Sequence, residues 1–402
     1  MKILLITQWY KPIKGAGAKR TTKMARTISE QNHQVSVLTG MPSYPTGVLP
    51  QKYHWKFWAR EKDEKIEILR TYEYPSPNQG VLRRIFNNLT FAISSSMAIF
   101  FLPKHEAVIV SSPPFISGLA GLLASKIWKA DFYFDVRDLW PDSAISMKLL
   151  SKGLFLKISE KLEFLYYQKA TKILTATPAI KKHLIGEGIP ELKIITLLNS
   201  VDTNFFKPQT INRQLYGFKK SDFIACYIGN HSRVYYLENI LKAAKLLKGR
   251  PNIKFLFVGE GEQKNDLLKL AENLKLANVI FWPLQKPDKI IKIINLADVG
   301  NVPLIPIKIF QEAIPTKTSE YLGCGKPIIA SVSGDLKNYL ETYQAGIVYK
   351  SGDPKEYAKA IMKLKNNSKL KQKMGRNARR LALDVFSDIK FSQTLKTVFS
   401  KF

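Results

Sequence analysis

Short apolar segments typical of buried strands alternate with segments of helical periodicity along nearly the whole chain. This alternation restricts the fold more than any other feature, because it is typical of parallel sheets whose strands are connected by helices. In the first half the strand-like segments lie at 2–7, 34–39, 107–112, 131–136, 172–177 and 193–198. In the second half they lie at 223–229, 254–259, 279–282, 326–331 and 346–349. The sequence therefore predicts an α/β protein made of two tandem Rossmann-like domains.

Residues 199–222 separate the two series and show little periodicity of either kind. We place the domain boundary there, with a first domain over 1–204 and a second over 205–384. Doubly wound domains bind their ligands at the carboxyl ends of the strands. Two such domains are therefore expected to face each other across a ligand-binding cleft.

Charge and cysteine content limit the partners and the compartment. Of 402 residues, 62 are Lys or Arg and 32 are Asp or Glu, which gives a formal net charge of +30 and indicates an anionic partner or surface. No nucleic-acid-binding motif is recognised, so nucleic acid is not expected as a partner. Cys226 and Cys324 lie in apolar segments, as buried thiols of a reducing compartment do. No apolar run reaches the roughly 18 residues of a membrane-spanning helix, so we expect a cytoplasmic protein.

Residues 310–331, FQEAIPTKTSEYLGCGKPIIAS, carry two carboxylates on either side of a proline and a lysine. Pro315 suits the start of a helix, the glycines after it suit the end, and the final apolar run predicts a strand. Lys317 then falls in the first helical turn, where free backbone N–H groups already attract an anion. A lysine there indicates that a ligand supplies the negative charge, unless the turn is only a solvated helix end.

Two further turns between a strand and a helix combine glycines with cations. Gly15 and Gly17 follow the first strand and lead into a helix whose first turn contains Arg20. Gly229 and Arg233 follow the first strand of the second half. Such turns also arise from packing alone. Together with the lysine described above, they would direct cations and helix N-termini at one site, which predicts a site for a diphosphate.

Eight segments in order carry a family resemblance: GAGAKRT (15–21), PSYPTG (42–47), SPPFISGLAG (112–121), FDVRDLWPDS (134–143), NSVDTNFF (199–206), YIGNHSR (227–233), FVGEGEQ (257–263) and the stretch 310–331. With them the chain resembles the family 4 glycosyltransferases of GT-B fold over essentially its whole length. The similarity is to a bacterial branch that assembles O-antigen and capsular sugars and includes L-fucosamine transferases. In this fold the last helix returns to the first domain, so 385–402 is expected to pack there.

The resemblance assigns donor-binding roles to residues of the second half. Glu320 is expected to bind the ribose hydroxyls of the nucleotide, and Glu312 the hydroxyls of the donor sugar. Lys317 and Arg233 are expected beside the two phosphates, where they would stabilise the charge that develops on the departing diphosphate. The expected donor site also includes the glycines of the two strand–helix turns and the polar residue after the second of these turns: Gly15, Gly17, Gly229 and Asn230.

Other assignments concern the acceptor and the chemistry. Arg137 and Asp138 stand where relatives often carry His-Asp, and Asp138 is the candidate for a catalytic or acceptor-orienting carboxylate, unless it only caps a turn. Arg137 cannot act as a base at neutral pH. It is expected to bind the acceptor together with Tyr44 and Thr46 of PSYPTG. Asn230 and aromatic residues replace the Arg…Lys pair of many relatives, which leaves Arg233 as the one cation of that loop.

The implied activity is retaining transfer of a sugar from a UDP-sugar to a saccharide on an undecaprenyl diphosphate carrier, in O-antigen or capsule synthesis. The donor could be an N-acetylated deoxyaminosugar such as FucNAc. The sequence contains no Asp-x-Asp triplet to hold a divalent cation, so no metal and no other cofactor are expected. The alternatives are a UDP-sugar epimerase of GT-B fold and, with less support, a basic nucleic-acid-binding protein.

Two segments of the first half mix aromatic, apolar and basic residues. Residues 81–106 are apolar on much of their circumference, with Arg83, Arg84 and Lys104 near the ends, and residues 53–60 interleave tryptophans with cations. Such mixtures suit the headgroup zone of an anionic membrane. Together with the lipid-linked acceptor they predict a peripheral protein on the inner face of the bacterial cytoplasmic membrane. The alternative is a core helix beneath a long loop.

Overall fold

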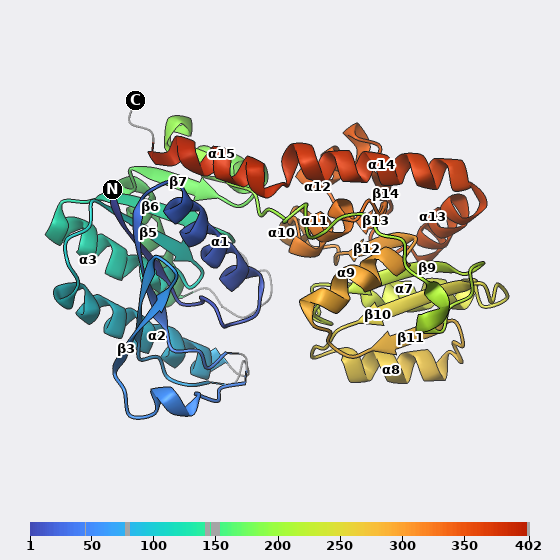
Figure 1. Ribbon diagram of the computed structural model, residues 1–402, viewed down its shortest axis with the longest axis horizontal. Coiled ribbons are helices and arrows are strands. Elements are labelled where there is room, and N and C mark those ends of the chain that lie inside the picture. Colours follow the sequence, from blue (N-terminus) through green and yellow to red (C-terminus); the bar gives the residue numbers. More distant parts are fainter. Residues whose placement is uncertain (45, 77–80, 141–144, 146–152, 400–402) are drawn as a thin grey trace. The chain divides into compact units, whose positions relative to one another are not determined.

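The computed structural model describes residues 1–44, 46–76, 81–140, 145 and 153–399. The chain divides into two compact units. Unit 1 comprises Met1–Leu198 and Phe391–Phe402, and unit 2 comprises Asn199–Lys390. Each unit contains one sheet with helices on both faces (Figure 1). The predicted α/β fold with two sheets of mainly parallel strands is confirmed. The predicted cleft between the domains stays a prediction.

The sheet of unit 1 has eight strands in the order β3-β4-β2-β1-β5-β6-β7-β8. Neighbouring strands are parallel except for the edge strand β3, which is antiparallel to β4. Because β1 pairs with both β2 and β5, the topological switch point lies at its carboxyl end. The strands are β1 (Lys2–Thr7), β2 (Gln34–Gly40), β3 (Trp58–Asp63), β4 (Ile66–Thr71), β5 (Ala107–Ser112), β6 (Asp131–Val136), β7 (Lys172–Thr175) and β8 (Ile194–Thr196).

Apolar side chains project from both faces of this sheet, and helices pack against both faces. Met24 of α1 and Leu395 of α15 belong to the core on one face. Phe91 of α2, Ala124 of α3 and Tyr166 of α5 belong to the core on the other face. The helices are α1 (Ala16–Glu30), α2 (Val81–Ala98), α3 (Gly118–Trp128), α5 (Leu154–Lys169), α6 (Pro178–Gly186) and α15 (Asp388–Phe399).

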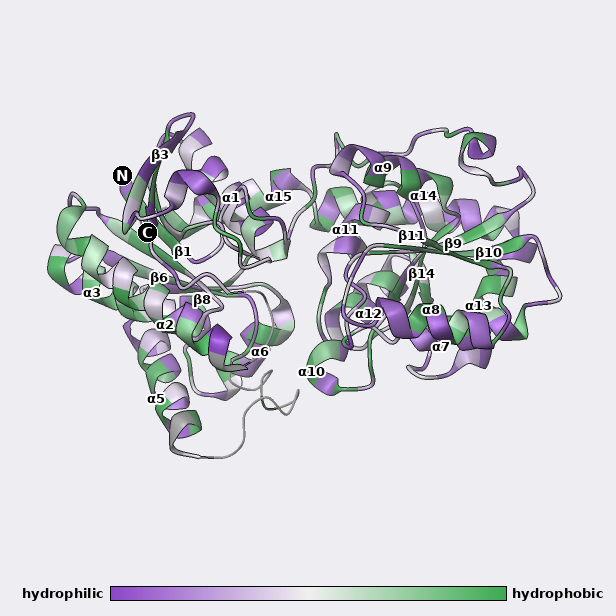
Figure 2. Ribbon diagram, turned by 90° about the horizontal axis from the view of Figure 1, so that it is seen from below, coloured by the Kyte–Doolittle hydropathy of each residue, from purple (hydrophilic) through white to green (hydrophobic). Residues whose placement is uncertain are grey.

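The sheet of unit 2 has six parallel strands in the order β11-β10-β9-β12-β13-β14. The strands are hydrophobic, whereas helices such as α7 and α13 carry hydrophilic stretches (Figure 2). The strands are β9 (Phe223–Ile228), β10 (Ile253–Val258), β11 (Val279–Trp282), β12 (Val299–Pro303), β13 (Ile328–Ser331) and β14 (Gly346–Val348). The helices are α7 (Leu237–Leu246), α8 (Lys264–Asn273), α9 (Pro287–Leu296), α10 (Lys308–Gln311), α11 (Thr316–Gly323), α12 (Gly334–Thr342), α13 (Pro354–Asn366) and α14 (Ser368–Val385).

Three strands escape the sequence analysis. β3 and β4 form a hairpin over Trp58–Thr71, part of which was interpreted only as a membrane-facing segment. β3 reads WAREKD, and its alternating exposure is that of an edge strand rather than of a buried apolar run. β12 reads VGNVP, whose Gly, Asn and Pro are all poor strand formers, yet every one of its residues is buried between β9 and β13.

The aperiodic segment 199–222 belongs to unit 2, and side chains of α14 hold it there. Arg379 donates hydrogen bonds to the carbonyl oxygens of Thr203 (2.9 Å), Phe206 (2.8 Å) and Gly323 (2.7 Å), the last being the end of α11. Along the chain, one unit ends and the other begins between Leu198 and Asn199, and again between Lys390 and Phe391. These junctions lie close to, but not at, the predicted boundaries of 204/205 and 384/385.

Arg20 does not face a ligand as its place in the first helical turn suggested. Its side chain is 1 % exposed and its guanidinium nitrogens contact the fully buried Asp135 of β6 at 2.6 and 3.1 Å. Ser111 of β5 donates a third hydrogen bond to the same carboxylate at 2.8 Å. The ion pair therefore joins α1 to the centre of the sheet.

Replacing Arg20 with Met should lower the free energy of unfolding by about 3–5 kcal/mol, because it leaves the Asp135 carboxylate buried without a cation. The double variant Arg20→Met/Asp135→Leu should recover much of that loss, since an apolar pair leaves no unpaired charge. Urea denaturation of both variants measures the two effects. A single variant as stable as the parent would contradict this account of the ion pair.

Candidate active site

The carboxyl end of β9 is the switch point of unit 2, because β9 pairs with β10 on one side and with β12 on the other. After β9 the chain turns at Gly229, whose φ of 134° lies in the region that favours glycine. A β-carbon at Gly229 would lie 2.9 Å from the Nζ atom of Lys317. The turn therefore needs glycine both for its backbone and for the lysine packed over it.

Lys317 is the buried cation at this edge of the sheet. It lies in the first turn of α11, whose N-cap is Pro315, so the predicted local structure is correct. Its Nζ atom lies 3.8 Å from the ring centroid of Tyr227 and 3.6 Å from that of Tyr235. Within the described residues this atom has no hydrogen-bond partner. The ammonium is thus enclosed by aromatic faces and a glycine.

Burial lowers the pKa of Lys317 well below its ordinary value, and the carboxylate of Glu320 opposes this shift. Two tyrosine rings attract a cation, but they do not replace the hydrogen bonds that water would accept. A charged ammonium therefore costs free energy here until an anion reaches it. The same position is close to the free backbone N–H groups at the start of α11, which also attract an anion.

The two glutamates flank this helix start. Glu312 is the C-cap of the short helix α10 rather than part of an irregular loop, and its Cγ would be 3.2 Å from a β-carbon at Gly334. Glu320 is partly buried in the second turn of α11. The next residue, Tyr321, accepts a hydrogen bond from the backbone N–H of Ile228 at 2.7 Å. This contact fixes α11, and with it Glu320, against the end of β9.

Two of the predicted donor-site residues, Asn230 and Arg233, are exposed in the loop after β9, whereas His231 between them is buried. The side chain of Arg233 is 78 % exposed, and its Nε atom lies 4.0 Å from a carboxylate oxygen of Glu262. Asn230 is exposed too, with its Oδ1 atom packed against Gly261. In this structure Arg233 is paired with an acidic side chain, so its place beside a phosphate stays a prediction.

Arg137 and Trp9 lie together at the switch point of unit 1. Arg137 follows β6, and its guanidinium donates to the carbonyl oxygens of Ser112 (3.0 Å) and Pro113 (2.6 Å), which end and follow β5. The guanidinium carbon lies 5.8 Å from the ring centroid of Trp9, which follows β1. The side chain is therefore held from two sides, with its planar face on an aromatic ring.

Two more of the predicted residues surround this pair. The ring of Tyr44 lies 5.5 Å from that of Trp9, and Gly17 contacts the Arg137 guanidinium so closely that a β-carbon would collide with it. Gly15 is the N-cap of α1. The exposed Thr46 accepts a hydrogen bond from the Val48 backbone N–H at 3.2 Å, which is a local turn contact.

Asp138, the candidate catalytic carboxylate, directly follows Arg137 and is exposed. Residues 141–143, which end the motif FDVRDLWPDS, lie outside the described residues. An exposed carboxylate just beyond the carboxyl end of β6 is accessible to a ligand. Whether it takes part in catalysis or orients an acceptor is not decided by its position, and both roles stay predictions.

Residues 208–381 match the family model described as Glycosyl transferases group 1. Over these residues the chain is therefore similar to the group 1 glycosyl transferases. The match spans most of unit 2, including β9 and α11, and therefore covers the Lys317 site.

Relatives and solved structures extend the similarity beyond unit 2. A protein of Escherichia coli named as a colanic acid biosynthesis glycosyl transferase, WcaI, is 24% identical over 358 residues, which cover 85% of this chain and 86% of the relative. The capsular polysaccharide biosynthesis glycosyltransferase CapM of Staphylococcus aureus is 23% identical over 319 residues, covering 76% of this chain and 79% of CapM. Anabaena HepE in complex with UDP-glucose has a TM-score of 0.72 at 16% identity, with all of both chains covered.

One buried polar cluster in unit 1 was missed from sequence. Glu73, two residues after β4, is 2% exposed and accepts hydrogen bonds from Gln8 (3.0 Å) and Ser43 (3.1 Å). Burial raises the pKa of Glu73 to about 7. Gln8 follows β1 directly and Ser43 precedes Tyr44, so this cluster connects the switch point to the loop that carries Tyr44. The only sequence signal was a lone glutamate after an unrecognised strand.

Binding of a diphosphate beside Lys317 should cause the lysine to take up a proton, because the negative charge of the ligand raises the lysine pKa that burial has lowered. Affinity for UDP should therefore fall as the pH rises toward the ordinary pKa of lysine, because burial lowers the pKa of Lys317 and leaves less of the unliganded lysine charged. Calorimetric titrations in buffers of different ionisation enthalpy report the proton uptake. Lys317→Met should abolish both effects, whereas Lys369→Met, at an exposed position on α14, should keep them. Identical heats in all buffers would contradict the prediction.

Proposed function

We propose that this glycosyl transferase moves a sugar from a UDP-sugar, with retention of configuration, to a lipid-linked saccharide in the synthesis of a bacterial surface polysaccharide. The observation that carries the proposal is the ammonium of Lys317, buried between Tyr227 and Tyr235 without a hydrogen-bond partner among the described residues. HepE, which shares the fold, binds UDP and UDP-glucose in its solved structures. A diphosphate supplies the anion that this lysine lacks.

The charges of unit 2 suggest how the leaving group would be stabilised. Transfer leaves a UDP whose β-phosphate gains negative charge, and the Lys317 ammonium and the N-terminus of α11 are fixed in place before that charge develops. Arg233 would leave Glu262 to join them. We propose that these groups act without a metal or other cofactor. Glu320 would accept hydrogen bonds from the ribose hydroxyls, and Glu312 from the hydroxyls of the donor sugar.

The switch point of unit 1 suits a sugar acceptor. Aromatic rings such as Trp9 and Tyr44 offer flat apolar faces to a sugar, and the Arg137 guanidinium beside them offers donors to its hydroxyls or to a phosphate. Asp138 would orient the attacking hydroxyl. The names of WcaI and CapM, which refer to colanic acid and capsular polysaccharide, support an acceptor from the same class of polymers. An O-antigen product and a FucNAc donor belong to the proposal through the family resemblance alone.

A row of exposed apolar side chains on α2 supports membrane attachment. We call it the α2 stripe; its members recur every three or four residues and continue just beyond the helix, as Phe86, Leu89, Ile93, Met97, Phe100 and Phe101. The opposite face of α2 is core, with Phe91 and Ala98 fully buried. Arg83, Arg84 and Lys104 are exposed near its two ends. In the part of the chain that the structure describes, no helix has the length and hydropathy of a membrane span.

An apolar helix face with cations at both ends is the arrangement of a helix lying in the headgroup zone. We therefore propose that α2 attaches the enzyme to the inner, anionic face of the cytoplasmic membrane. There the α2 stripe would enter the acyl boundary, and the arginines would meet lipid phosphates. Such attachment would bring unit 1 to a lipid-linked acceptor.

Glu320→Gln tests the donor site. The change keeps the shape of the side chain but weakens an acceptor of two ribose hydroxyl bonds, so the Kd for UDP should rise at least about tenfold. Calorimetry with UDP measures it, and Glu341→Gln, on the exposed side of α12, is the matched control. Unchanged UDP affinity would exclude the ribose role. If incubation with UDP-sugars yields an epimeric UDP-sugar and no glycoside, the enzyme is an epimerase instead.

Charge reversal on α2 tests membrane attachment. Arg83→Glu/Arg84→Glu should release the protein from anionic vesicles at low salt, because each cation near such a surface contributes about 1 kcal/mol. The control Lys355→Glu/Lys359→Glu makes the same charge change on α13 of unit 2 and should leave binding intact. Vesicle sedimentation measures both, with UDP binding as the test of folding. Equal sedimentation of the two double variants would rule out attachment through α2.

A further inference from the structure

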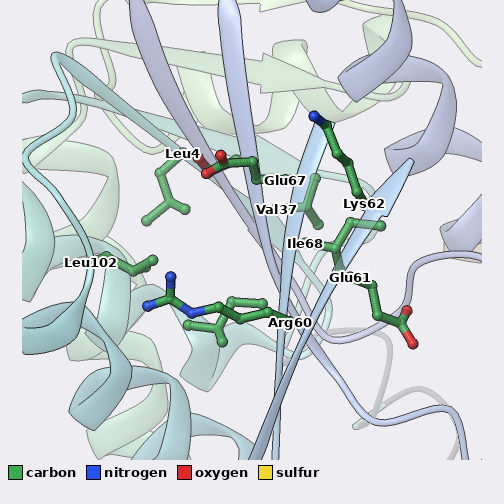
Figure 3. A pocket seen from close by; sticks show the side chains of 10 residues that line it. Leu4, Val37, Arg60, Glu61, Lys62, Glu67, Ile68 and Leu102 are labelled. Carbon is green, nitrogen blue, oxygen red and sulfur yellow. The ribbon is translucent and has the colours of Figure 1, made fainter. Parts of the chain in front are cut away.

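A pocket of about 360 Å³ opens on the α2 face of the unit 1 sheet (Figure 3). Its floor is apolar, with Leu4 of β1, Leu69 of β4 and Leu102, which follows the α2 stripe. Leu4 and Leu69 also belong to the core that α2 covers. The volume lies in the range of small-molecule sites, roughly 300–1,000 Å³. Leu4 and Leu69 lie within strands, whereas the candidate acceptor residues follow the carboxyl ends of the strands.

Arg60 is the unpaired charge of this pocket. Among the described residues its guanidinium makes no hydrogen bond and no ion pair. It extends toward Leu102 across the apolar floor (Figure 3). The second cation, Lys62, stands directly opposite Glu67 in the β3–β4 pair, so those two charges largely offset each other. Glu61, which also lines the pocket, is paired with Lys52 (2.8 Å) and Arg70 (2.7 Å). The guanidinium of Arg60 is thus the charged group of the pocket that has no partner among the described residues.

The mouth of the pocket is continuous with the α2 stripe. Trp58 and Arg60 alternate along β3 and therefore share a face. The ring of Trp58 lies 5.0 Å from that of Phe101, the last member of the stripe, and Leu102 of the floor comes next in the chain. Trp58 and Phe101 are 40% and 61% exposed. A bilayer that receives the stripe would therefore reach the pocket as well.

We propose that this pocket binds one anionic phospholipid of the membrane, with the phosphate on Arg60 and the first methylenes of an acyl chain on Leu4, Leu69 and Leu102. A guanidinium binds phosphate through two parallel hydrogen bonds, which a single unpaired arginine can supply. The apolar floor would not suit a free phosphate ion, which stays fully hydrated. An exposed tryptophan at the mouth is the residue typical of the interface between headgroups and acyl chains.

This proposal rests on the proposed membrane attachment and adds a defined lipid site to it. Attachment through the stripe needs only an apolar face and anionic charge. The pocket adds selection of a lipid by its headgroup charge and by the presence of a chain. The two can be separated, because a short-chain lipid in solution can occupy the pocket without a bilayer.

Calorimetric titration with dihexanoyl phosphatidylglycerol, kept below its critical micelle concentration, tests the site. The parent should bind it, and Arg60→Gln should bind it about tenfold more weakly through loss of a charge-assisted contact. Leu102→Trp should abolish binding by filling the pocket. Lys65→Gln, the same charge change in the β3–β4 turn outside the pocket, should bind as the parent does. Neither sn-glycerol 3-phosphate nor dihexanoyl phosphatidylcholine should match the anionic lipid.

Vesicle sedimentation of the same variants separates the two proposals. Arg60→Gln and Leu102→Trp should still sediment with anionic vesicles, because the α2 stripe and its arginines are intact. A parent that sediments but does not bind the short-chain lipid, or an Arg60→Gln variant that binds it equally well, would overturn the pocket proposal alone. Equal binding of sn-glycerol 3-phosphate would overturn it too. A parent that binds the lipid but never sediments would overturn attachment and leave the lipid site standing.

Discussion

The burial of one ammonium, that of Lys317, determines how the switch point of unit 2 is built. A cation without hydrogen-bond partners is costly in a protein interior, and here only two aromatic faces and a glycine surround it. The sheet order makes the position possible, because β9 has β10 on one side and β12 on the other, which places the turn at Gly229 at the switch point. Tyr321 then ties α11 to the end of β9, which fixes the backbone of the helix turn that carries the lysine. Binding of an anion would recover the free energy that is lost when the Lys317 ammonium is buried without hydrogen-bond partners.

The two units solve the problem of holding a cation differently. In unit 1 the guanidinium of Arg137 donates hydrogen bonds to two carbonyl oxygens at the end of β5 and lies over the face of Trp9, so part of its hydrogen-bonding capacity is satisfied before any ligand arrives. In unit 2 the ammonium has no such acceptors among the described residues. The first arrangement favours orientation of an uncharged hydroxyl-bearing partner, and the second favours capture of charge. This contrast is consistent with an acceptor in unit 1 and a sugar nucleotide in unit 2.

Local patterns made the sheet strands and the Lys317 turn predictable, whereas contacts between distant segments were not. Apolar runs such as that of β9 are visible in any window, and a proline followed by a lysine marks a helix start without reference to other segments. β12 was missed because it contains Gly, Asn and Pro, which are poor strand formers, and it forms a strand only through pairing with its neighbours in the sheet. Arg20 seemed to face a ligand because its partner Asp135 lies 115 residues further along the chain. The surroundings of Trp9 and Glu73 could not be predicted, because they depend on the pairing of β1, β2 and β4, whose carboxyl ends lie together.

The excess of positive charge that first indicated an anionic partner is distributed among three kinds of position. Some cations form ion pairs within the protein: Arg20 with Asp135, and Arg213 and Lys371 with Asp298. Lys317 is buried, so salt would screen its attraction to a diphosphate only weakly. Arg60 and the arginines of α2 are exposed, where a Debye length of about 8 Å at physiological ionic strength governs their reach. The proposed donor binding and the proposed membrane contact would therefore differ in their sensitivity to salt even though both would depend on phosphate, because burial and not chemistry sets the dielectric around each cation.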